Sequence, residues 1–346
     1  GTAGKNLQLT IDAGLQNFTM ARLKGESAGV VVMDTVSGDL VAVVSSPAFD
    51  PNKFVRGISS SDYKELTKNL YRPLASKTVQ GAYPPGSTFK MVVALAGLDA
   101  GVITPEGTEW CPGYLETGSR RFHCWKSGGH GKVNLHASIQ QSCDVYYYEI
   151  AQKIGIDRIS AMANRLGLGT RFDLPMSAIS EGLTPTRDWK RTARGAEWVI
   201  GDSLNASIGQ GFVLASPLQL AVRTARIASG NAVMPRLVKS IDGKDQPVSA
   251  EPLGLARSHL NVVRDAMYAV SNSRQGTGYG SRVVDDTMHI AGKSGTSQVR
   301  NITKAERARG VFRNEDLPWE RRDHALYVAY GPAEKPRYAV AVIVEH

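Results

Sequence analysis

The sequence is poor in cysteine and aromatic residues, and it has no long apolar run. Its 346 residues include three cysteines, and 7% of them are aromatic. An odd number of cysteines leaves one unpaired if a disulfide forms. A membrane-spanning helix needs an apolar run of about 18 residues or more, and no such run occurs. Basic residues do not alternate with aromatic ones along any stripe, so a nucleic-acid partner is not expected.

The sequence also lacks an initiator methionine and a signal peptide, so residues 1–4 are interpreted as a linker or a trimmed end. What is present is ordinary for a globular protein, with 42% hydrophobic and 21% charged residues. The length suits one large lobed domain or two small ones. A net charge of +9 would attract anionic lipid head groups or an anionic lipid-linked substrate. A mildly basic solvated surface explains the same charge, and we prefer that interpretation.

Strand-like segments occur at both ends of the chain, and helical patterns occupy the middle. Apolar and β-branched runs predict strands over 7–12, 28–34, 39–45, 288–299, 325–330 and 338–344. Apolar periodicity predicts helices over 13–23, 59–70, 135–153, 157–166, 214–228 and 258–270. Irregular structure is expected over 101–134 and 174–194, and a long charged loop over 300–323. The order predicts one sheet built from both chain ends, helices on both of its faces and an inserted helical lobe.

One stretch combines a sharp turn with a serine and a lysine. Pro84, Pro85 and Gly86 exclude a helix, whereas the apolar run 91–98 predicts a buried one. Ser87 is therefore expected at a helix N-terminus, where unpaired N–H groups and the helix dipole favour negative charge. Lys90 lies one turn away on the same face, so a neutral, buried amine would reach the serine hydroxyl as its base.

Two further motifs follow in a fixed order. Ser142 and Asp144 open a second apolar helix, and the run Lys293-Ser294-Gly295-Thr296 follows a strand-like segment. Each residue alone has an ordinary explanation, such as a helix cap or a solvated strand position. Together, Ser-x-x-Lys, Ser-x-Asp and Lys-Ser-Gly form the motif set of serine β-lactamases and penicillin-binding proteins. A space between the two lobes would bring all three motifs together.

The chain resembles a class B penicillin-binding protein from about Leu7 to its end. The runs 83–90, 125–131 and 207–211 carry this resemblance beside the three motifs. Asp144 and the Trp…Gly-His-Gly run are similar to the elongation type, penicillin-binding protein 2. The resemblance implies an αβα transpeptidase fold and a single catalytic domain over 1–346, without the membrane anchor and pedestal of the family. Its sheet lobe would comprise about 7–86 and 285–346, and its helical lobe about 87–284.

The resemblance and the residue chemistry together assign a role to each motif. Ser87 would attack a carbonyl to form an acyl-enzyme, with Lys90 as its base and Lys293 as the neighbouring cation. Lys293 would alternatively bind a substrate carboxylate. Ser142 would relay a proton to the leaving amine. The substrate-binding residues would be Ser294, Gly295 and Thr296.

Two details complete this assignment. Backbone N–H groups of Ser87 and Thr296 would form an oxyanion hole. Asp144 replaces the more common asparagine, and an ionised aspartate cannot donate a hydrogen bond. Asp144 is therefore expected either to pair with Lys90 or Lys293, or to accept a hydrogen bond from a substrate amide.

The cysteines cluster with one histidine in the sequence. Three thiolates and an imidazole form a closed tetrahedral zinc set, here with the pattern Cys-x12-Cys-x5-His-x12-Cys. The expected ligands are Cys111, Cys124, His130 and Cys143, with His123 and His136 as alternatives. Such a site would hold the Ser142 motif in place. A disulfide between Cys111 and Cys124, or three reduced buried cysteines, are the other interpretations.

The expected activity is peptidoglycan D,D-transpeptidation in cell elongation, inhibited by β-lactams. The resemblance implies stem peptides as substrate, a membrane glycosyltransferase and other elongation proteins as partners, and the periplasmic face of the bacterial inner membrane as location. A serine β-lactamase, with Glu181 as a possible deacylation base, is the first alternative. A penicillin-binding sensor domain and a carboxypeptidase are the others.

Overall fold

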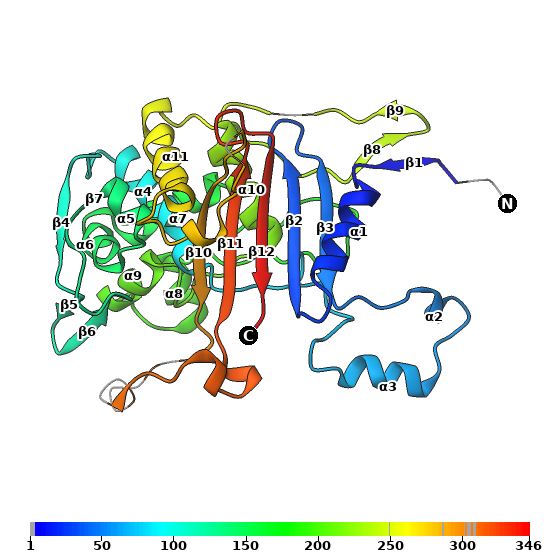
Figure 1. Cartoon of the computed structure of the whole chain (residues 1–346), viewed down its shortest axis with the longest axis horizontal. Coiled ribbons are helices and arrows are strands. Elements are labelled where there is room, and N and C mark those ends of the chain that lie inside the picture. The colour runs from blue at the N-terminus through cyan, green and yellow to red at the C-terminus, as the bar shows by residue number, and fades with distance from the viewer. Residues whose placement is uncertain (1–3, 249, 286, 301, 303–305, 307–308) are drawn as a thin grey trace.

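The computed structural model describes residues 4–248, 250–285, 287–300, 302, 306 and 309–346 (Figure 1). Its centre is a five-stranded antiparallel sheet in the order β10-β11-β12-β2-β3. The strands are β10 Ala291–Ser297, β11 His324–Gly331, β12 Tyr338–Val344, β2 Ala28–Asp34 and β3 Leu40–Ser46. The two ends of the chain therefore form one sheet, as the sequence predicts.

Helices cover both faces of this sheet because its strands are apolar on both sides. Helix α1, Ala13–Arg22, packs against β3 on one face, and Asp12 caps it by accepting the Leu15 N–H at 2.8 Å. Helix α10, Pro217–Ser229, packs against β2, β11 and β12 on the other face. Helix α11, Arg257–Asn272, packs against β10. All three helices are predicted by the sequence.

The helical lobe lies beyond the β10 edge of the sheet (Figure 1). A 3-10 turn, η1, spans Gly86–Phe89 and leads into helix α4, Lys90–Asp99, whose residues 90–98 are all buried. The other helices of the lobe are α5 Leu135–Gln140, α6 Asp144–Ile154, α7 Ile156–Arg165, α8 Arg187–Arg194 and α9 Ile200–Ser207. Among the described residues, no helix is long and apolar enough to cross a membrane.

Several local predictions are wrong. The helix predicted over 135–153 is broken at 141–143, because Ser142 adopts φ 56°. The segment predicted as irregular over 174–194 contains α8. The loop-rich segment 101–134 contains four short strands in two two-stranded sheets: β4 Thr108–Cys111 with β7 Gly131–Asn134, and β5 Tyr114–Thr117 with β6 Arg120–His123.

The smaller elements lie at the margins of the fold. Strand β1, Leu7–Leu9, joins a separate sheet with β8 Val238–Ile241 and β9 Lys244–Asp245. The short helices are α2 Asn52–Val55, α3 Ser60–Lys68, η2 Tyr279–Ser281, η3 Asn314–Asp316 and η4 Trp319–Arg321. The last two lie within the predicted charged loop over 300–323, part of which falls outside the described residues.

A buried carboxylate ties the end of β12 to the turn before Ser87. Glu345 is 2% exposed and accepts hydrogen bonds from Ser27 Oγ, Arg72 Nη2 and Tyr83 OH, each at 2.7 Å. These donors hold the pKa of Glu345 below its usual value, although burial alone would raise it. The central strand and the Tyr83 turn are thereby fixed to each other.

Candidate active site

Ser87 lies half-buried in η1, at the start of the buried helix, as the sequence predicts. The Lys90 backbone N–H donates to Ser87 O, which places the two residues one tight turn apart. The turn η1 packs against β10, the strand that carries the third motif. Gly86 has φ 54°, and a Cβ there would lie 2.2 Å from Thr296 O, so only glycine allows this approach.

Lys90 is fully buried, and its amine meets three acceptors. Its Nζ donates to Asp144 Oδ1 at 2.7 Å, to Ser142 O at 2.9 Å and to Ser142 Oγ at 3.1 Å. A protonated amine has three donors, so this arrangement satisfies all of them. The structure therefore gives Asp144 the first of its two expected positions, paired with Lys90.

Lys293 approaches Ser142 from β10. Its buried Nζ donates to Ser142 Oγ at 3.0 Å and to Ser294 O at 2.9 Å. Burial lowers the pKa of Lys293 well below its usual value, and the positive charge of Lys90 lowers it further, while Asp144 opposes the change. The sequence predicts Lys90 as the neutral amine. In the structure Asp144 pairs with Lys90, whereas among the described residues no carboxylate is hydrogen-bonded to the Lys293 amine.

Ser142 lies between the two amines at the junction of α5 and α6. Its φ of 56° is unusual for a residue with a side chain and places its hydroxyl between Lys90 and Lys293. Asp144 Oδ2 accepts the Trp125 backbone N–H at 2.9 Å. We call Ser87, Lys90, Ser142, Asp144 and Lys293 the serine–lysine cluster.

The remaining predicted site residues lie on the edge strand β10. Ser294 Oγ is 3.0 Å from Thr277 Oγ1, and Thr296 O accepts from Gln210 Nε2 at 2.8 Å. The inner side of β10 pairs with β11, with Gly295 opposite Leu326. A cavity of about 280 Å³ adjoins Thr296. The other residues that line it are Arg300, Ile302, Val311, Phe312, Asn314, Leu317, Asp323, His324 and Ala325.

Three further residues reach this region without having been predicted. Thr277 contacts Ser294, and Gln210 contacts Thr296, as described above. Arg223 of α10 is fully buried and donates from Nη1 to Thr88 O at 2.6 Å. Its Nε and Nη2 have no hydrogen-bond partner among the described residues, and burial lowers the pKa of Arg223 to about 9. Sequence reasoning noted only the run that contains Gln210.

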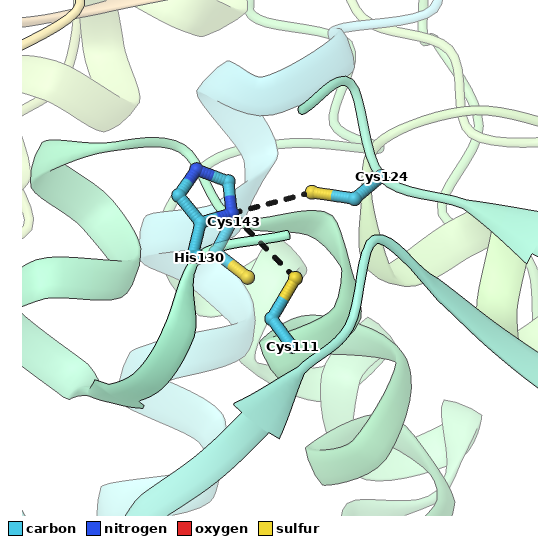
Figure 2. Close-up of side chains that lie close together, drawn as sticks. All are labelled: Cys111, Cys124, His130 and Cys143. Carbon is cyan, nitrogen blue, oxygen red and sulfur yellow. Dashed lines mark hydrogen bonds between the residues drawn. The ribbon is translucent and has the colours of Figure 1, made fainter. Parts of the chain in front are cut away.

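The predicted cysteines and histidine also converge (Figure 2). Cys111 ends β4, Cys124 follows β6, His130 precedes β7 and Cys143 caps α6. The four ligand atoms lie within 4.8 Å of one another, and all three cysteines are free, so the alternative disulfide is not formed. The group includes neither His123 nor His136. We call it the thiol cluster.

The geometry of the thiol cluster fits a tetrahedral zinc site. His130 Nδ1 lies 3.6 Å from Cys111 Sγ and 3.5 Å from Cys124 Sγ. Zinc bonded to nitrogen at about 2.0 Å and sulfur at about 2.3 Å would separate these atoms by about 3.5 Å. A hydrogen bond from the Cys143 thiol lowers the pKa of Cys124 to about 5, although burial opposes the change. The donor set and spacing thus suit a soft divalent metal.

The antiparallel sheet, the helical lobe and the serine–lysine cluster define a serine acyltransferase domain. Residues 28–346 match the family described as penicillin binding protein transpeptidase domain, and the chain belongs to that family. It is 38% identical to the peptidoglycan D,D-transpeptidase MrdA of Acinetobacter baumannii, covering 100% of this chain and 52% of the relative. It is 36% identical to MrdA of Escherichia coli, covering 99% of this chain and 55% of the relative.

Solved structures agree with this relationship. The complex of Pseudomonas aeruginosa PBP2 with WCK 5153 superposes with TM-score 0.88 at 39% identity, over 99% of this chain and 74% of that chain. PBP2 in its complex with MreC from Helicobacter pylori has TM-score 0.87 at 34% identity, over 98% and 60%. The resemblance to the elongation type and the expected fold class are thus confirmed. The chain spans about half the length of the curated relatives it matches.

Proposed function

We propose that this chain is the catalytic part of a peptidoglycan D,D-transpeptidase that acts in cell elongation. The observation that carries the proposal is the Ser142 hydroxyl, which is hydrogen-bonded by both Lys90 and Lys293. Lys90 itself lies one tight turn after Ser87. A serine between two buried amines can pass protons in either direction. The family membership and the names of the relatives support the same activity.

Acylation would begin with a proton shift through Ser142. Lys90 gives a proton to Ser142 Oγ, and Ser142 gives its own to Lys293, which leaves Lys90 neutral. Lys90 then takes the Ser87 proton while Ser87 Oγ attacks the penultimate D-alanine carbonyl. The N–H groups of Ser87 and Thr296 stabilise the oxyanion. The C–N bond breaks, and Lys293 returns a proton through Ser142 to the departing D-alanine amine.

The second half of the reaction would form the cross-link. An amine from a neighbouring stem peptide attacks the acyl-enzyme ester and loses a proton through Ser142 to Lys293. The bond between the acyl carbon and Ser87 Oγ breaks, and Lys90 returns its proton to Ser87 Oγ. A β-lactam would acylate Ser87 in the same way, but its ring-opened acyl group stays attached. The hydroxyls of Ser294 and Thr296 would hold a substrate carboxylate on the β10 side, together with Thr277, whose Oγ1 lies 3.0 Å from Ser294 Oγ.

Intact mass spectrometry after incubation with a penicillin tests this proposal. A stable adduct of one drug mass on Ser87, absent from Ser87→Ala, is expected. Hydrolysed drug without an adduct would favour the β-lactamase alternative. Unmodified protein with intact drug would overturn the proposal. Cross-linking of stem peptides by the full-length protein, compared with simple release of D-alanine, would separate the transpeptidase from a sensor and a carboxypeptidase.

We also propose that the thiol cluster holds a structural zinc ion. The ligands would be Cys111, Cys124, His130 and Cys143, which the geometry above supports. When bound, the ion would fix the Ser142–Asp144 segment and would take no part in acyl transfer. Elemental analysis of protein purified without added metal is expected to find about one zinc per chain. Absence of zinc together with three titratable thiols would overturn this proposal.

The whole protein is proposed to be anchored in the bacterial inner membrane, with this domain in the periplasm. Its proposed partners are a membrane glycosyltransferase and other elongation proteins. The Helicobacter pylori complex of PBP2 with MreC supports this, as does a structure, 30% identical, of a peptidoglycan synthase complex that coordinates polymerization and crosslinking. Copurification of the full-length protein with a glycosyltransferase from solubilised membranes tests it. Recovery of that protein from the cytoplasm without either partner would contradict it.

A further inference from the structure

We propose that Gln210 is a positioning residue that directs the Thr296 N–H toward the oxyanion site. The inference rests on the proposed acyl-transfer function and deepens it, because it names what holds one of the two oxyanion donors. Gln210 follows α9 in the loop 207–211 and is 8% exposed. Its amide is not expected to touch the substrate.

The side chain of Gln210 binds the backbone of the residue that carries the donor. Gln210 Nε2 donates to Thr296 O at 2.8 Å. Strand β10 is at the edge of the sheet, so one of its sides has no neighbouring strand. Within a strand, the N–H and C=O of one residue point to the same side. A carbonyl that faces Gln210 beyond the open edge therefore implies that the Thr296 N–H also faces the open edge.

The alternation along β10 agrees with this direction. Ser294 O accepts from Lys293 Nζ at 2.9 Å. The backbone N–H and C=O groups of successive residues in a strand point to opposite sides. Ser294 and Thr296 are two residues apart, so their backbone groups face the same open edge. The turn η1 with Ser87 packs along this strand. The Thr296 N–H is thus on the side of β10 from which the Ser87 turn approaches.

The same loop also holds the Ser87 turn. The Gly86 N–H donates to Gly209 O at 2.9 Å. Gly209 has φ 70°, and a Cβ there would lie 2.3 Å from Gly86 O. Gly86 in turn leaves no room for a Cβ beside Thr296 O. The loop 207–211, the Ser87 turn and β10 therefore meet backbone to backbone, and the Gln210 amide joins the loop to the strand.

This arrangement makes one loop responsible for the spacing between both oxyanion donors. Removing an oxyanion donor outright slows catalysis by about 10²–10³-fold. A donor that remains but is displaced by about 1 Å costs up to about 10²-fold. Loss of the Gln210 hydrogen bond is thus expected to slow acylation about ten- to a hundredfold. Ground-state binding of a penicillin should change little, because the oxyanion forms only as the bond is made.

The test compares Gln210→Met and Gln210→Glu with a matched buried glutamine. Both variants remove the donor and keep the length of the side chain, and the glutamate also turns a negative charge toward Thr296 O. Gln219 of α10 is fully buried, and its Nε2 donates to Glu181 O at 2.7 Å and to Thr170 O at 3.0 Å. Gln219→Met therefore removes a comparable structural amide from a different part of the fold.

Stopped-flow acylation by a fluorescent penicillin gives the acylation rate constant and the non-covalent dissociation constant separately. Gln210→Met is expected to lower the rate constant ten- to a hundredfold with a dissociation constant within about twofold of wild type, and Gln210→Glu to lower it further. Gln219→Met is expected to lower the melting temperature but keep the rate constant. If Gln210→Met does not fold, the acylation rate constant and dissociation constant of Gln210→Glu are compared with those of wild type and Gln219→Met instead.

Two results would overturn the inference. One is a Gln210 variant that acylates at the wild-type rate. The other is a loss of rate no larger than that of Gln219→Met at equal thermal stability. Neither affects the proposed function, which fails separately if wild-type protein forms no Ser87 adduct or if Ser87→Ala still forms one.

Discussion

The serine–lysine cluster and the thiol cluster share one short segment but balance their charges in opposite ways. Ser142 and Asp144 face the lysines, whereas Cys143, between them, faces the other thiols. The first cluster has two buried amines and one carboxylate, all supplied by the chain. The second has three cysteine sulfurs and an imidazole. The first cluster balances its charges with side chains alone, whereas the second would do so with the proposed zinc ion.

The two clusters are connected by direct hydrogen bonds. The Asp144 N–H donates to Cys124 Sγ at 3.4 Å, and Asp144 Oδ2 accepts from the Trp125 N–H next to that cysteine. The carboxylate that pairs with Lys90 is therefore oriented from the thiol side. A substitution in the thiol cluster should therefore affect Lys90 through Asp144, and its effect should be smaller than that of a substitution of Lys90 itself.

The largest effect is expected when the pair Lys90–Asp144 is broken. Lys90→Met should slow acylation at least about a thousandfold, because Ser87 loses its base. It should also destabilise the fold by about 3–5 kcal/mol, because Asp144 is left unpaired and buried. Adding Asp144→Asn should restore most of the stability and none of the activity. Denaturant unfolding measures the stability, and penicillin labelling measures the acylation rate. A Lys90→Met variant as stable as wild type would contradict the pairing of Lys90 with Asp144.

The next effect concerns the thiol cluster. Cys111→Ser should reduce zinc from about one per chain to a small fraction and lower the melting temperature. For a metal present a thousandfold above its Kd, the loss is about 4 kcal/mol. Acylation should fall less than in Lys90→Met. Thermal unfolding with and without a chelator provides the control, since a chelator should destabilise wild type but not Cys111→Ser. Equal destabilisation of both proteins would show that the cluster is not the metal site.

Lys293 should behave in the opposite way to Lys90 in stability. Its pKa is lowered in the folded protein, so the unfolded chain binds more protons at neutral pH and Lys293 destabilises the fold there. This penalty disappears as pH rises toward the unfolded pKa of about 10.4. Lys293→Met should therefore raise the free energy of unfolding at pH 7 and raise it less at pH 10, while acylation is lost. If the difference in unfolding free energy between Lys293→Met and wild type grew as pH rises, the pKa of Lys293 would not be lowered in the folded protein.

The smallest effect tests the shared segment itself. Ser142 has φ 56°, a conformation that glycine adopts without a side-chain penalty. Ser142→Gly should be more stable than Ser142→Ala by about 1 kcal/mol, whereas both should lose the proton relay and slow acylation about equally. Paired unfolding curves and labelling rates separate the two contributions. Equal stability of the two variants would mean that the segment relaxes out of this conformation.

The sequence predicts the local parts of the serine–lysine cluster from spacing. Ser87 and Lys90 are one turn apart, and Ser142 lies two residues before Asp144, the first residue of α6. It also predicts that strands from both ends join, because their apolar runs need partners. It could not predict which lysine pairs with Asp144. The contact of Asp144 with Lys90 joins segments more than fifty residues apart.

Two of the three missed contributors have partners that are distant in the chain. Gln210 and Thr296 are separated by 86 residues, and Arg223 and Thr88 by 135. No periodicity records such a contact. The break between α5 and α6 is not predicted for a related reason, since helical propensity favours continuity whereas Ser142 makes its contacts with Lys90 and Lys293 from φ 56°.

The order of strands in the sheet has a consequence for how the molecule is made. β2 pairs with β12, and these strands lie about 300 residues apart in the chain. The hairpin of β2 and β3 therefore keeps an open apolar edge until the late strand β12 is available to pair with β2. Pairing over such a separation closes slowly and leaves intermediates prone to aggregation. Biogenesis of this protein should thus depend on chaperones that shield one early strand edge until its late partner arrives.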